Sequence, residues 1–142
     1  MSTNATIAMA HPAADTIEYI YLHWDGYVHN GAGETLAMHY TTREKVKKLM
    51  ALGDLSILGT EPIDFPEGWN PGVEVPDDRC LSYNARGDHS PANRLPSKMF
   101  WGSHAPEQEF NYYFDADGVW WYWRDSDSDS LKKLLPASLD HE

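Results

Sequence analysis

The stretch "EFNYYFDADGVWWYW" at residues 109–123 restricts the fold more than any other part of the chain. Asp117-Gly118 is a strong signal for a tight two-residue turn, and aromatic residues flank it on both sides. We therefore predict a β-hairpin. Aromatic side chains this dense indicate that both faces of the hairpin are covered, or that one of them is a contact surface.

A second strand is predicted at residues 17–25, "IEYIYLHWD", where Ile and Tyr dominate and both faces are largely apolar. This pattern is typical of a central strand. Asp25-Gly26 then breaks the strand, "HNGAG" forms a loop, and "GETLAMHY" is compatible with a short helix.

The strongest helix signal is "TTREKVKKLMALGD". Thr41 or Thr42 can cap its N-terminus, with Glu44 placed to complete a capping box, and Gly53 is a natural end. An apolar stripe at helical spacing consists of Val46, Leu49 and Met50.

The segment at residues 54–78 is rich in proline and glycine and is predicted to be a long irregular loop, with room for one short strand or turn. A loop of this length often carries function. Cys80 to Ala85 alternates enough for a strand. Together these elements predict an α+β fold, with a small antiparallel sheet, an aromatic β-hairpin and two or so helices packed on one face.

The chain length of 142 residues fits a single domain. We expect a flexible N-terminal arm at residues 1–15, the α+β domain at residues 16–124, and an acidic link with a C-terminal tail at residues 125–142. The start lacks the features of a secretory signal, and no apolar run is long enough to cross a membrane. The expected location is therefore the cytoplasm.

The chain has 22 acidic and 11 basic residues, which gives a net charge of −11. This charge argues against nonspecific binding to nucleic acid or to an anionic membrane. It indicates either simple solubility or a basic protein partner, bound by imitating nucleic acid. Cys80 is the lone cysteine, so no internal disulfide forms, and a small buried apolar role is expected for it.

The corner "HWDGY" contributes four candidate binding residues: His23, Trp24, Asp25 and Tyr27. Its structural interpretation is a turn with Trp24 in the core. Its functional interpretations are a ligand base stacked on Trp24 or Tyr27, a metal held with His29 or His39, or His23 as a general base oriented by Asp25.

Three further candidate binding residues lie elsewhere. Arg86 follows the predicted strand at residues 80–85 and can take a phosphate if it lies beside the corner. Trp120 and Trp121 belong to the aromatic hairpin. The sequence contains no HExxH or CxxC metal pattern and no GxSxG, Walker A or GxGxxG motif. We therefore expect no metal and no cofactor, and the sequence favours a non-catalytic role.

The stretches "YIYLHWDGY", "ETLAMHYTTREKVKKLMALGDLSILG" and "EFNYYFDADGVWWYW" resemble a group of small uncharacterised proteins of bacteriophages and prophages that share the HWDGY motif. The resemblance covers residues 17–59 well and 109–123 loosely, and the middle of the chain departs from it. It implies an accessory gene that blocks a host defence or alters host metabolism, and it carries no activity to particular residues.

The expected function is therefore that of a non-catalytic, phage-type accessory protein in the host cytoplasm. It would bind and inhibit a host defence protein with a basic surface, or sequester a small signalling ligand such as a nucleotide. A homo-oligomer could gather the cations that a nucleotide requires. The alternatives are a small nucleotide- or ester-directed hydrolase that uses His23 and Asp25, and a structural component of a virion.

Overall fold

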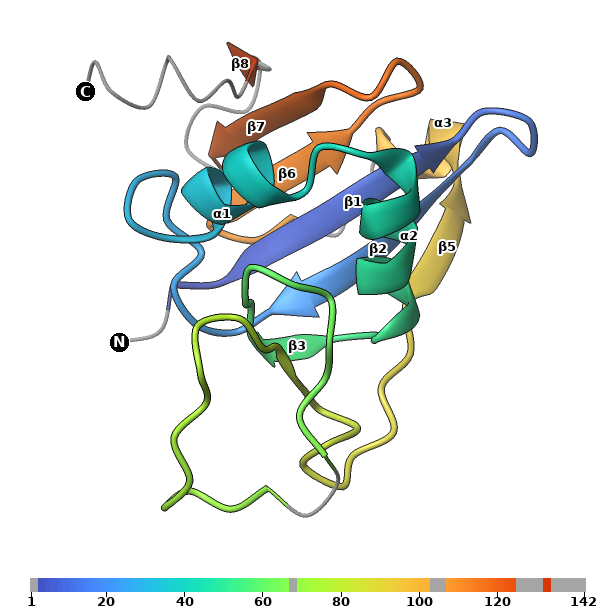
Figure 1. Ribbon diagram of the computed structural model, residues 1–142. Coiled ribbons are helices and arrows are strands. Elements are labelled where there is room, and N and C mark those ends of the chain that lie inside the picture. The colour runs from blue at the N-terminus through green and yellow to red at the C-terminus, as the bar shows by residue number, and fades with distance from the viewer. Residues whose placement is uncertain (1–2, 67–68, 103–106, 125–131, 134–142) are drawn as a thin grey trace.

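A computed structural model of the chain describes residues 3–66, 69–102, 107–124 and 132–133. Its strands form one mixed sheet in the order β4-β3-β2-β1-β6-β7-β8, and β5 also pairs with β2 (Figure 1). The strands are β1 (Ala5–His11), β2 (Thr16–Leu22), β3 (Leu55–Ile57), β4 (Leu81–Ser82), β5 (Asn93–Pro96), β6 (Phe110–Phe114), β7 (Trp120–Arg124) and β8 (Lys132–Lys133). The predicted α+β class is confirmed, but the sheet is mixed because β1 pairs with β6, and β2 with β3, in parallel.

The strand β1 corrects the expectation of a flexible arm at residues 1–15. It lies between β2 and β6, and the side chains of Ala5, Ile7 and Met9 are fully buried. Alanine has a low strand propensity, so burial between two neighbouring strands, and not local preference, forms this element. The expected link and tail at residues 125–142 lie outside the described residues, apart from the pair that forms β8.

The helices α1 (Ala32–His39) and α2 (Arg43–Ala51) lie on the same face of the sheet, as Figure 1 shows, and α3 (Ser97–Phe100) is a single turn next to β5. Two of the sequence signals at the ends of α2, a threonine cap and a glycine end, are confirmed. The predicted capping box with Glu44 is wrong, because the cap is Thr42 and the residue three positions after it is Lys45. Thr42 is the N-cap, with its Oγ1 accepting a hydrogen bond from the Lys45 N–H, and Gly53 follows the helix with a left-handed φ of 79°. None of the helices among the described residues is long and apolar enough to cross a membrane.

The hairpin of β6 and β7 forms as predicted, but its turn is longer by one residue. The Asp115 N–H donates to the Val119 carbonyl at 3.0 Å, so Ala116, Asp117 and Gly118 form the turn, with Gly118 left-handed at a φ of 79°. This is the three-residue hairpin in which a left-handed glycine matches the twist of the strands.

Both faces of this hairpin are covered. Phe114 and Trp120 pack into the core under the helices. On the opposite face, Trp123 and Tyr113 pack with Phe100 of α3. Most of the hairpin's aromatic residues therefore serve packing on its two covered faces and do not form a contact surface.

The carboxylate of Asp115 organises the turn. Its Oδ1 accepts hydrogen bonds from the N–H groups of Asp117 and Val119, and its Oδ2 accepts one from the Trp121 indole. Burial alone would raise the pKa of Asp115. The three hydrogen bonds, together with the Arg43 guanidinium, outweigh it and hold that pKa below its ordinary value.

This lowered pKa predicts a contribution to acid stability. Because the folded-state value lies below the unfolded one, the carboxylate stabilises the fold above about pH 4, and the stabilisation is lost as the pH falls through the lowered pKa. We expect Asp115→Asn to unfold more easily at neutral pH and to lose less stability on acidification. Urea unfolding across the acid range measures this, with the exposed Asp117→Asn as the control. Parallel pH profiles for wild type and Asp115→Asn would contradict the assignment.

Candidate binding site

The corner "HWDGY" begins as an extension of the sheet. Beyond the end of β2, the His23 N–H donates to the Leu55 carbonyl at 3.0 Å, and the Trp24 N–H donates to the Ser56 carbonyl at 3.2 Å. Asp25 then takes a left-handed conformation with a φ of 57° and turns the chain away from the sheet. Aspartate is one of the few residues that tolerates this conformation, which explains its place here.

Gly26 is held on both sides by buried hydrogen bonds. Its N–H donates to the Thr3 carbonyl at 2.8 Å, and its carbonyl accepts a bond from the Tyr112 hydroxyl at 2.6 Å. A Cβ at this position would lie 2.7 Å from the Thr3 carbonyl oxygen and 2.9 Å from the Ala5 Cβ. The glycine of the motif is therefore required for packing.

The loop after the corner closes the N-terminus of α1. The N–H groups of Ala32, Gly33 and Glu34 donate to the carbonyls of Asp25, Tyr27 and Val28, respectively, at 2.9 to 3.0 Å. The first-turn donors of a helix can bind phosphate only when they are free. Here they are used by the loop itself, so this helix end does not provide a phosphate site.

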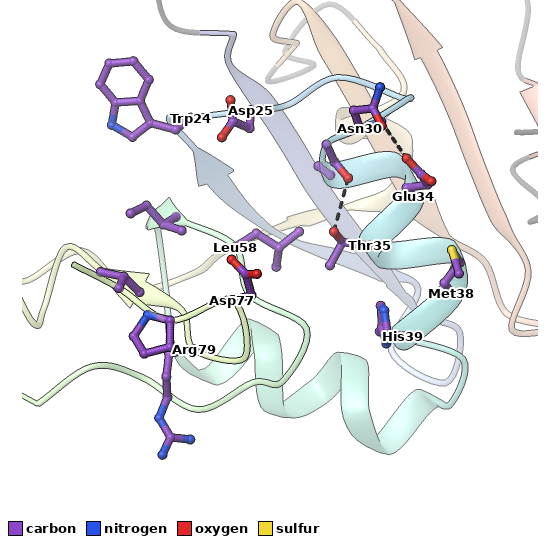
Figure 2. Close-up of a pocket in the computed structure, with 15 residues that line it drawn as sticks. Trp24, Asp25, Asn30, Glu34, Thr35, Met38, His39, Leu58, Asp77 and Arg79 are labelled. Atoms are coloured by element: carbon purple, nitrogen blue, oxygen red, sulfur yellow. Dashed lines mark hydrogen bonds between the residues drawn. The ribbon is translucent and has the colours of Figure 1, made fainter. Parts of the chain in front are cut away.

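A pocket of about 420 Å³ lies beside the corner, and we call it the Trp24 pocket. It is lined by Trp24 and Asp25 just beyond β2, by residues of α1 and the two residues before it, by the end of β3, and by the loop at residues 75–79 (Figure 2). Residues of the long loop therefore line this pocket. Trp24 is 44% exposed at the rim.

The polar lining of the Trp24 pocket is predominantly acidic. Its carboxylates are those of Asp25, Glu34 and Asp77. Glu34 accepts a hydrogen bond from the Asn30 N–H at 2.6 Å, whereas the side chains of Asp25 and Asp77 accept none from the described residues. Figure 2 shows Asp77 directed toward Leu58, while Arg79 extends away from α1. The arrangement therefore favours a cationic occupant.

His23 and Asp25 do not form the base and orienter considered above. The His23 ring bonds through Nδ1 to the Tyr21 hydroxyl at 2.8 Å, and no hydrogen bond joins it to Asp25 within the described part of the chain. Two residues share a face only in a continuing strand. Here β2 ends at Leu22 and Asp25 is left-handed, so the expected alignment is lost.

The other candidate residues from the sequence are dispersed. Tyr27 is 44% exposed, lies edge-on to Phe110 and does not line the Trp24 pocket. Trp120 is buried in the core, where its Nε1 donates to the Tyr40 carbonyl at 2.8 Å, so it offers no contact surface. Trp121 is half-buried and donates to Asp115.

Arg86 does lie near the corner, as the sequence interpretation required. Its Nη1 donates to the Ser56 Oγ at 3.3 Å, and Ser56 is the residue whose carbonyl pairs with Trp24. It does not line the Trp24 pocket. The structure thus brings together Trp24 and Asp25 in one pocket and places Arg86 at a separate but neighbouring position.

Glu34 and Asp77 were missed by the sequence interpretation. Glu34 lies in the first turn of a helix, where an acidic residue is common and does not indicate a binding role. Asp77 belongs to a loop whose path no local sequence pattern specifies. The one available signal was the length of that loop.

Cys80 is buried as expected, and burial raises the pKa of its thiol to about 11. Its Sγ accepts a hydrogen bond from the Gly59 N–H at 3.3 Å. A thiol held neutral in this way is a packing element and not a nucleophile.

No protein-family model, curated protein or solved structure was found to match this chain. Within the described residues, no group of three or more His, Cys, Asp or Glu side chains is arranged to hold a metal ion. The functional argument therefore depends on the geometry of the pocket.

Proposed function

We propose that this protein is a non-catalytic binding protein whose Trp24 pocket takes a basic side chain of a partner protein. In the setting that the phage resemblance implies, the partner is a host protein with a basic surface, such as a defence protein, which is inhibited in the host cytoplasm. The observation that carries this proposal is an exposed tryptophan at the rim of a pocket with two carboxylates, those of Asp25 and Asp77, that accept no hydrogen bond from the described residues.

Physical chemistry supports a basic occupant. A tryptophan ring attracts a guanidinium or ammonium group over its face, and a carboxylate forms charge-assisted hydrogen bonds with either. Tryptophan is also enriched among the residues that dominate binding energies at protein interfaces. The net charge of −11 attracts a basic protein over a longer range and accelerates encounter.

The same observations make a sequestered nucleotide the weaker candidate. Its phosphates would lie among Asp25, Glu34 and Asp77, and the nearest helix N-terminus has its first-turn donors already bonded to the loop. The hydrolase alternative loses its basis because His23 is bonded to Tyr21 and not to Asp25.

The test is an NMR titration with N-acetyl-L-arginine N-methylamide as the probe. Its citrulline counterpart has the same shape without the charge and serves as the matched probe. We expect the arginine probe to shift the Trp24 indole and the Asp77 amide signals, and the citrulline probe to bind roughly threefold to tenfold more weakly, as the loss of one partly exposed charge interaction implies.

Two adjacent aspartates provide a matched pair of variants. Asp77 lines the pocket, whereas its neighbour Asp78 does not. We expect Asp77→Asn to weaken binding of the arginine probe roughly threefold to tenfold and Asp78→Asn to leave it unchanged. Equal binding of both probes, or equal effects of both variants, would contradict the proposed function.

A further inference from the structure

We propose that Arg86 is a second contact point, which takes a carboxylate side chain of a partner protein. We call the group formed by Trp69, Tyr83 and Arg86 the Arg86 platform. The identity of the partner depends on the proposed function, because we assign both contacts to one protein. The chemistry of the platform is argued from its own geometry and is tested separately.

The guanidinium of Arg86 is held by two aromatic rings. Its Cζ lies 5.5 Å from the centre of the Trp69 ring and 5.4 Å from the centre of the Tyr83 ring. The hydrogen bond to Ser56 Oγ, in β3, fixes it from a third direction. Such contacts orient a guanidinium without using its capacity for a fork of two parallel hydrogen bonds.

The charge of Arg86 has no ion-pair partner in the part of the chain that the structure describes. This is unexpected in a chain with 22 acidic and 11 basic residues, where a nearby carboxylate is easily supplied. Arg94, in contrast, pairs with Glu18 at 3.5 Å. Arg86 is exposed, so an incoming carboxylate can reach it.

An aromatic row connects the Arg86 platform with the Trp24 pocket. It runs from Tyr83 through Tyr21 and His23 to Trp24, and the centres of successive rings lie 6.5, 5.9 and 4.8 Å apart. These residues come from β2, its extension and the segment after β4, which the sheet brings side by side. Half-exposed aromatic residues between two charged positions of opposite sign suit a protein segment with a basic residue at one end and an acidic residue at the other.

A carboxylate fits the platform better than a phosphate. A carboxylate carries one negative charge and matches the two-donor fork of a single guanidinium. A phosphate is recognised in proteins by several cations or by free N–H groups of a helix N-terminus, and the platform provides one arginine with Asp88 only two positions away in sequence.

The experiment uses N-acetyl-L-glutamate N-methylamide as the probe, with the glutamine counterpart as the uncharged control. We expect the glutamate probe to shift the Trp69 indole and Arg86 Nε–H signals in NMR spectra, and to bind roughly threefold to tenfold more tightly than the glutamine probe. Arg86→Gln should remove this preference. Arg86→Lys, which keeps the charge but lacks the planar fork, should retain part of it.

Arg124→Gln is the matched control, because Arg124 is also an exposed arginine over an aromatic ring, that of Phe110 at 4.8 Å. It should bind the glutamate probe as the wild type does. A charge preference that persists in Arg86→Gln would overturn the proposal. Tighter binding of inorganic phosphate than of the glutamate probe would overturn the assignment of a carboxylate.

The two proposals fail separately. If the glutamate probe binds at Arg86 while the arginine probe does not bind at Trp24, the proposed function falls and the platform remains. The reverse result removes the platform and leaves the Trp24 pocket. Circular dichroism and thermal unfolding of Arg86→Gln and Arg86→Lys establish that a lost shift reflects binding and not a lost fold.

Discussion

Replacing Trp120 with alanine is expected to lower the free energy of unfolding by about 3–5 kcal/mol. The side chain is 4% exposed and packs edge-on against Phe114, with the ring centres 5.0 Å apart. Its removal leaves a cavity under the helices and deprives the buried Tyr40 carbonyl of its indole donor. Urea unfolding followed by far-UV circular dichroism measures the loss.

Trp24→Ala is the matched comparison, because it also removes an indole but from a position 44% exposed. We expect it to change the free energy of unfolding by less than about 1 kcal/mol and to weaken the arginine probe about fivefold or more. The two tryptophans thus separate stability from binding. A large loss of stability in Trp24→Ala with a small one in Trp120→Ala would reverse the roles assigned to them.

Replacing Gly26 with alanine is expected to cost on the order of 3 kcal/mol. The new Cβ would meet the Thr3 carbonyl oxygen, which is backbone, and the Cβ of Ala5, which lies in the central strand. Neither can move without disturbing the N-terminal end of β1. The strain therefore reaches the hydrogen bond between the Tyr112 hydroxyl and the Gly26 carbonyl.

Gly72→Ala is the control for this substitution. Among the described residues, a Cβ at Gly72 meets the Asn70 Oδ1 alone, at 3.4 Å, and Gly72 is exposed. We expect a change within about 0.5 kcal/mol. Chemical denaturation of both variants under the same conditions compares their free energies of unfolding. Equal stability of the two variants would show that the backbone around Gly26 can adjust to a Cβ, against this prediction.

The parts of the fold that the sequence predicted are those with strong local signals. The helix from Arg43 to Ala51 is flanked by Thr42, which caps its N-terminus, and by Gly53, which follows its end. The hairpin contains a turn with the left-handed Gly118. The strand β1 has no such signal. It forms because it pairs with β2 on one side and β6 on the other, and β6 lies far along the chain.

The candidate site was predictable to a smaller extent. Trp24 and Asp25 stood out because an aromatic residue and an acid follow a strand and precede a glycine. Asp77 could not be found because the path of the loop at residues 58–80 is set by tertiary hydrogen bonds, such as those from the Ser82 N–H to the Asp64 carboxylate and from the Thr60 N–H to the Asp77 carbonyl. The interpretation of Trp120 as a surface residue failed because alternation identifies two faces without showing which of them is covered.

The parallel pairing of β1 with β6 has a consequence for folding during synthesis on the ribosome. Ala5 leaves the exit tunnel early, whereas its partner Phe110 is synthesised long after it. Until then the nascent chain presents the open edge of a largely apolar strand, which is a template for aggregation. Pairings of such high contact order are slow to form. We therefore expect the yield of correctly folded protein in cell-free synthesis to depend more on chaperones than the final stability suggests.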